Sequence, residues 1–117
     1  MRAILIVVYF LVGSSAVYAS CSGPNFNPIW DGEISITKTS DNGKCTTRIN
    51  RSQVPIYAAE IVSQPKNGKA FVRDRLHVSY RAAAGFKGTD TFTFQWIGKK
   101  GGVTPSAAKI NLTVVVK

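Results

Sequence analysis

Polar and apolar residues alternate with a period of two along short segments of residues 33–117. The alternation is sharpest at residues 33–37 (EISIT) and 91–96 (TFTFQW), and such a period indicates half-buried β-strands. Turn signals separate the segments, above all Asp41-Asn42-Gly43 and Pro65-Lys66-Asn67-Gly68. The pattern predicts strands at 33–37, 45–50, 56–63, 69–73, 76–81, 91–96 and 110–114, with a crossover at 82–89 and a loop at 98–105.

The first nineteen residues have a different pattern. Arg2 precedes ten unbroken apolar residues, 3–12, and small residues lead to Ala19. This is the layout of a cleaved secretory signal peptide, and ten residues at ~1.5 Å each reach only about half of a bilayer core. We therefore predict a signal peptide at 1–19, with an uncleaved anchor as the alternative, and no membrane-spanning segment.

The rest of the chain is sufficient for one small domain. Val, Ile and Thr are frequent, whereas Leu, Met and Glu are scarce, which favours strands over helices. Short strands separated by closely spaced turns predict an all-β sandwich of about seven strands. We expect an irregular N-terminal lead-in at 20–32 and the sandwich domain at 33–117.

The two cysteines have two interpretations. A disulfide between Cys21 and Cys45 suits an exported chain and would contribute roughly 3 kcal/mol of stability. Alternatively, residues 18–21 loosely match a bacterial lipobox in which Cys21 is acylated, although Tyr18 stands where that box has an aliphatic residue. Two cysteines and one histidine are too few for a zinc site, so no metal is expected.

Residues 64–70 (QPKNGKA), 78–80 (VSY) and 85–94 (GFKGTDTFTF) resemble the bacterial immunoglobulin-like and cadherin-like repeat domains. These domains carry a Pro-x-x-Gly turn, a Tyr strand and a Gly-Phe-x-Gly-x-Asp-x-Phe-x-Tyr segment in the same order. The resemblance covers about residues 56–117 and implies a Greek-key sandwich with binding or adhesive roles and no catalysis. Phe94 stands where the family has Tyr, and Gly98-Lys99-Lys100-Gly101 replaces the acidic residues of calcium-binding relatives.

No residue pattern points to catalysis. His77 is the only histidine and alternation places it opposite Leu76 and Val78, so we expect it to face solvent. Two Ser-x-x-Lys matches, at 63–66 and 106–109, fall at predicted strand ends instead of a helix start. Asp90 is expected to bind backbone N–H groups at the crossover. We expect neither an enzyme nor a cofactor.

Most aromatic residues are expected to fill the space between the sheets. They are Phe71, Phe86, Phe92, Phe94 and Trp96. Trp30 and Tyr57 are less committed to the core, and an exposed aromatic pair there would be suited to stacking on sugars.

The positive charge exceeds what folding requires. Without residues 1–19 the net charge is +8, from 14 Lys and Arg against six Asp and Glu. Successive connections of an antiparallel sandwich alternate between its two ends, so the loops 51–55, 73–75 and 98–104 are expected to share one end. The predicted ligand-binding residues at that end are Arg51, Arg73, Arg75, Lys99 and Lys100, opposed only by Asp74, a local charge of +4. The other end, with Lys44, Lys66 and Lys87 against Asp41 and Asp90, is expected to carry about +1.

Three interpretations of function remain open. The first is an exported binding module, periplasmic or secreted, that engages an acidic polysaccharide, lipopolysaccharide or another polyanion through the basic end. The second is a module directed at a protein, such as an envelope-assembly subunit or an inhibitor of a secreted enzyme. The third is an enzyme with an unfamiliar site, which no residue pattern in the sequence supports. For the charge by itself, the simplest interpretation is solubility.

Overall fold

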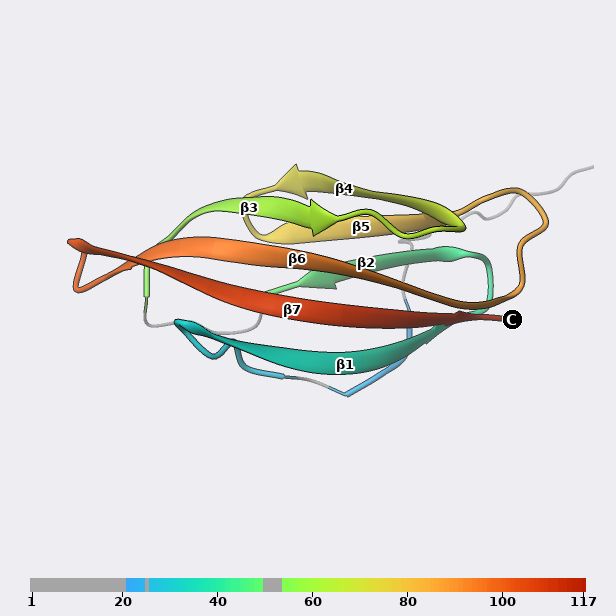
Figure 1. Cartoon of the computed structure of the whole chain (residues 1–117), viewed down its shortest axis with the longest axis horizontal. Helices are drawn as coiled ribbons and strands as arrows, with labels where there is room; N and C mark the ends of the chain where they lie inside the picture. Colours follow the sequence, from blue (N-terminus) through green and yellow to red (C-terminus); the bar gives the residue numbers. More distant parts are fainter. Residues whose placement is uncertain (1–20, 25, 50–53) are drawn as a thin grey trace, which may run out of the picture.

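The computed structural model describes residues 21–24, 26–49 and 54–117, and within them all regular structure is β. The predicted signal peptide lies outside these residues. Seven strands form two sheets (Figure 1). The larger sheet has the order β1-β7-β6-β3, and its strands are β1 (Gly32–Ser40), β7 (Thr104–Val116), β6 (Gly88–Lys100) and β3 (Ile56–Ser63). The smaller has the order β2-β5-β4, with β2 (Lys44–Arg48), β5 (His77–Ala82) and β4 (Gly68–Asp74).

The strand pairing is antiparallel except at one edge, where β1 runs parallel to β7. The prediction of seven strands is confirmed, and β3 has the predicted bounds. The prediction of a loop at 98–105 is wrong, because β6 and β7 continue as a long hairpin in which Lys99 pairs with Pro105. Gly101 and Gly102 make this possible, since both adopt positive φ (60° and 77°) and close the chain in a tight turn.

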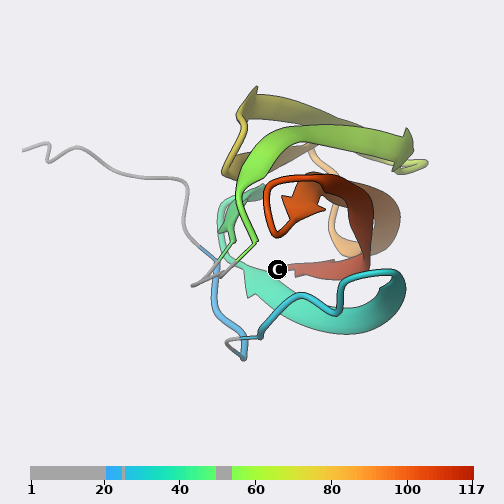
Figure 2. The same ribbon diagram turned by 90° about the vertical axis from the view of Figure 1, so that its left-hand side faces the viewer.

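The core lies between the two sheets, which enclose it when the molecule is seen along its strands (Figure 2). Phe92, Phe94 and Trp96 are at most 1% exposed, as their alternation along β6 predicted. Phe94 packs edge-on against Trp96 with ring centroids 5.0 Å apart, and Phe92 stacks on Tyr80 of the opposite sheet at 5.8 Å. Phe71 does not belong to this buried cluster, because it pairs with Ser79 on the outward face of the small sheet.

The lead-in is held against the body of the domain. Cys21 and Cys45 form a disulfide with Cα atoms 5.0 Å apart, which confirms the predicted pair. Ser22 then bridges to Thr39 at the end of β1, and the Phe26 ring stacks on Trp96 at 6.2 Å. Trp30 is likewise packed against the core, so it is not free to stack on a ligand as the sequence had allowed.

Asp90 organises the corner where the chain passes between the sheets. Its carboxylate accepts hydrogen bonds from the backbone N–H groups of Lys66 and Asn67, both at 3.1 Å, which confirms its predicted role. The Tyr80 hydroxyl donates a third, at 2.8 Å. Burial, and secondarily this bond to a carboxylate, raises the pKa of Tyr80 far above its usual 10.0.

Candidate anion-binding surface

Four of the predicted basic residues, Arg73, Arg75, Lys99 and Lys100, lie at one end of the sandwich, here called the hairpin end (residues 29–31, 48–49, 54–57, 73–77 and 98–105). The tip of the β6–β7 hairpin, the β4–β5 turn and the start of β3 meet there, since Gly98 pairs with Ile56 and the Lys99 N–H donates to the Pro55 carbonyl. The hairpin and the β4–β5 turn lie at the same end in Figure 1. This agrees with the predicted alternation of connections.

Two of the predicted ligands converge on the start of β3. The Arg75 guanidinium donates through Nη1 to the Ile56 carbonyl at 3.4 Å, and Lys99 Nζ lies 5.2 Å from the centre of the Tyr57 ring. Tyr57 itself is 53% exposed. The result is an exposed ring with the Lys99 ammonium over it and the Arg75 guanidinium bonded to the backbone of the preceding residue. We call these three residues the Tyr57 cluster.

The other predicted ligands do not join this cluster. Lys100 points to the other side of the hairpin and pairs with Asp31, Nζ to Oδ2 at 2.6 Å. This contact lowers the pKa of Asp31 below its usual value, chiefly through the hydrogen bond from Lys100. Arg73 is exposed on β4, and Arg51 lies outside the described residues.

Asp74 and His77 form a second charged contact at the hairpin end. Their Oδ1 and Nδ1 atoms lie 2.7 Å apart, and Asp74 Oδ1 also accepts from the backbone N–H groups of Leu76 and His77. These hydrogen bonds, led by that of the His77 side chain, lower the pKa of Asp74. The sequence pattern paired no carboxylate with His77, because the bond depends on the tight turn that connects β4 to β5.

The charge of the two ends differs from the prediction. Over the described residues the hairpin end has five cations, including Arg48, and two carboxylates, Asp31 and Asp74, a local charge of +3. We call the opposite end the crossover end (residues 41–44, 64–69, 81–90 and 116–117). It has six cations against Asp41 and Asp90, a charge of +4. The count exceeds the expected charge of about +1 because Lys69, Arg81 and Lys117 lie at or beyond strand ends, where a count of loop residues misses them.

Other kinds of site find little support in the described part of the chain. It contains no group of three or more His, Cys, Asp and Glu side chains placed to hold a metal ion. Both Ser-x-x-Lys segments start on strands, Ser63 at the end of β3 and Ser106 within β7. No helix among residues 21–24, 26–49 and 54–117 is long and apolar enough to cross a membrane.

Comparison of the chain with known protein families, curated proteins and solved structures found no match. The chemistry of the Tyr57 cluster therefore rests on its own contacts. An exposed ring offers an apolar face to the C–H groups of a sugar, while guanidinium and ammonium groups bind carboxylates, sulfates and phosphates. The sequence had left Tyr57 uncommitted to the core, and its exposure agrees with that interpretation.

Proposed function

We propose that this chain is a small exported, non-enzymatic binding module that engages an acidic glycan or a related envelope or host polymer through the hairpin end. The Tyr57 cluster is the observation that carries this proposal. Charge kept only for solubility would need no aromatic ring exposed beside it, whereas a charged sugar polymer uses both features.

The strand order supports an immunoglobulin-like Greek-key architecture. In sandwiches of that type the second, fifth and fourth strands form one sheet, and the seventh, sixth and third form the other. This chain has the orders β2-β5-β4 and β7-β6-β3, with β1 added in parallel beside β7. Such domains bind ligands at loops gathered at one end, which is where the Tyr57 cluster lies.

The disulfide supports export. Disulfides persist in oxidising compartments, and the Cys21 thiol used here is the one that lipidation would consume. The proposal therefore includes cleavage of residues 1–19 and a non-lipidated protein in the periplasm or outside the cell.

Titration of the oxidised protein with a heparin-derived hexasaccharide at several salt concentrations tests the site. The double variant Arg75→Gln/Lys99→Gln is expected to weaken binding at least tenfold and to flatten the log–log salt slope by roughly 1.4, for two lost contacts. Tyr57→Ala is expected to weaken binding without changing the slope, because stacking releases no counterion.

The matched control is Lys38→Gln/Lys109→Gln, which removes the same charge from β1 and β7, away from the cluster. Burial lowers the pKa of Lys38, so a neutral Gln there removes no stabilising charge. Equal weakening by both double variants would show that net charge alone governs binding and would leave solubility as the explanation of the basic residues.

One observation favours the alternative of a protein-directed module. β3 and β4 are the outermost strands of their sheets and expose Val62 (48%) and Val72 (39%). An exposed strand edge can pair with an extended segment of another protein. Saturable binding to a protein at high salt, unaffected by the Arg75 and Lys99 substitutions, would favour this function instead.

A further inference from the structure

Three cations lie next to one another across the small sheet at the crossover end. Lys44 of β2 pairs in register with Arg81 of β5, and Arg81 pairs on its other side with Lys69 of β4. Residues paired in this way project from the same face of a sheet, and all three are exposed. We call Lys44, Arg81 and Lys69 the Arg81 row.

The three adjacent cations of the Arg81 row do not stabilise the fold. Like charges directly opposite one another on neighbouring strands destabilise a sheet. Both ion pairs found among the described residues, Lys100–Asp31 and His77–Asp74, lie at the other end of the molecule. The repulsion within the row is therefore uncompensated by any described carboxylate in contact with it.

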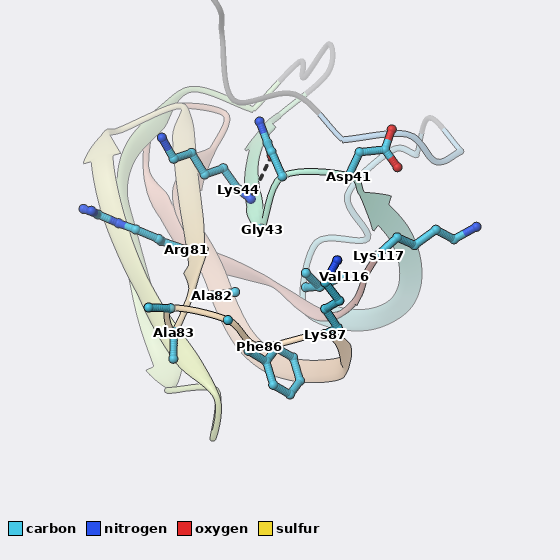
Figure 3. A pocket seen from close by; sticks show the side chains of 13 residues that line it. Asp41, Gly43, Lys44, Arg81, Ala82, Ala83, Phe86, Lys87, Val116 and Lys117 are labelled. Carbon is cyan, nitrogen blue, oxygen red and sulfur yellow. Dashed lines mark hydrogen bonds between the residues drawn. The ribbon is translucent and has the colours of Figure 1, made fainter.

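Two open pockets adjoin the row, and Arg81 lines both. One, of about 310 Å³, is bordered by Lys44, Lys87 and Lys117 and floored by small residues including Ala82 and Val116. The second, of about 360 Å³, is bordered by Lys66 and Lys69 and contains Phe71. In Figure 3, Lys44 and Arg81 extend to one side of the first pocket and Lys117 to the other, with Lys87 between them beside Val116.

The backbone around the pockets is firmly held. The Asn42 side chain accepts from the Lys44 N–H at 3.0 Å, and the Gly43 carbonyl accepts from the Ala82 N–H at 2.7 Å. Gly43 has a positive φ of 76°, and a Cβ there would project between Ala82 and Val116, onto the floor of the first pocket. On the other side, Asp90 fixes the backbone of Lys66 and Asn67. The cations are thus presented on a preorganised frame.

We propose that the crossover end is a second anion-binding site, centred on Arg81, for an acidic polysaccharide. Strands lie about 4.8 Å apart, so the row spans about 10 Å from Lys44 to Lys69 and suits several negative groups along a chain better than one phosphate. Guanidinium at the centre binds a sulfate or carboxylate through two parallel hydrogen bonds. Phe71, half-buried within the second pocket, offers a ring beside the cations.

A membrane surface fits this end less well. Stable peripheral binding to a membrane combines attraction to anionic lipids with apolar side chains that enter the lipid. The large hydrophobic residues exposed in the described part of the chain are Ile29, Tyr57, Val62, Val72 and Val103, and neither pocket includes any of them. The Arg81 site does not depend on the Tyr57 cluster. If both act, one domain bridges two polysaccharide segments and gains avidity from the linkage.

The test is amide chemical-shift mapping of the oxidised, ¹⁵N-labelled protein with the heparin-derived hexasaccharide. Saturable shifts are expected at residues 43–45, 68–70 and 80–82. The triple variant Lys44→Gln/Lys69→Gln/Arg81→Gln is expected to abolish these shifts and to keep the wild-type melting temperature or exceed it, since repulsion is relieved. Shifts at residues 56–58 and 98–100, which report the Tyr57 cluster, are expected to persist.

The matched control is Arg73→Gln/Arg75→Gln/Lys99→Gln, which removes three charges from the hairpin end and should leave the Arg81 shifts intact. Should the triple crossover variant unfold, Arg81→Gln alone is expected to raise the dissociation constant at least fivefold at the same residues. Three results would each overturn the proposal: hexasaccharide shifts absent from 43–45, 68–70 and 80–82, tighter binding of inorganic phosphate than of the hexasaccharide, or binding only to phosphatidylglycerol-containing vesicles.

Discussion

At the hairpin end, each described carboxylate has a cationic or imidazole partner within hydrogen-bonding distance, whereas at the crossover end three cations adjoin one another and Asp90 is turned inward to the backbone. The local charges, +3 and +4, are almost the same. The two ends therefore differ in how their charged side chains are paired more than in their net charge. The ion pairs fix local geometry, while cations with no carboxylate partner among the described residues, in the Tyr57 cluster as in the Arg81 row, keep their attraction for an external anion.

The largest expected effect tests whether the two ends share one core. Phe92 lies on the crossover side of β6 and Trp96 on the hairpin side, and both are fully buried. Phe92→Ala and Trp96→Ala are each expected to reduce the free energy of unfolding by ~3–5 kcal/mol, measured by urea denaturation. Both should unfold in a single transition. A stable second transition in either variant would mean that the ends unfold separately.

The next effect contrasts a buried carboxylate with exposed ones. Tyr80→Phe removes a donor from Asp90 and should cost about 1–3 kcal/mol. Because the pKa of Tyr80 is raised, the folded state retains this proton above the pH at which the unfolded chain loses it. This contribution is complete below pH 10 and is lost as the pH rises further.

Urea denaturation of the wild type and of Tyr80→Phe, at pH 8 and at about pH 11, checks both statements. The difference between the two proteins should shrink at the higher pH. Asp31→Asn, at the exposed hairpin-end pair, serves as the comparison and should leave the melting temperature nearly unchanged. A loss from Asp31→Asn equal to that from Tyr80→Phe would contradict the contrast between the ends.

The smallest effect is a gain in stability that is expected on removing a cation at the crossover end and not at the hairpin end. Arg81→Gln relieves repulsion from two neighbouring cations and should stabilise the protein by ~0.2–1 kcal/mol at low salt. Lys100→Gln breaks the pair with Asp31 and should give no gain. Thermal melts at low and at high salt measure both, and the Arg81 effect should shrink as salt screens the charges. Stabilisation by Lys100→Gln of equal size would remove the electrostatic distinction.

The sequence predicted where the strands lie along the chain better than which strands and side chains lie next to one another. Alternation along residues 33–37 and 91–96 identified strands, because one face of each packs toward the core and the period of two follows directly. The hairpin at 98–105 was missed, since its two lysines and three glycines favour a loop, while the backbone pairing that extends the strands depends on the neighbouring strand. The Arg81 row was missed for a related reason. Lys44, Lys69 and Arg81 are far apart in sequence, and only the strand register makes them neighbours.

The disulfide has a mechanical consequence. Cys21 is joined to Cys45 at the start of β2, while Lys117 lies beside the end of β1, with its N–H bonded to the Ser40 carbonyl. Tension applied between Cys21 and Lys117 passes through the sulfur bridge into the small sheet, so the covalent backbone of the intervening lead-in and β1 is bypassed. Reduction would place those 24 residues under load and lengthen the extended chain by about 80 Å, a step that force spectroscopy resolves.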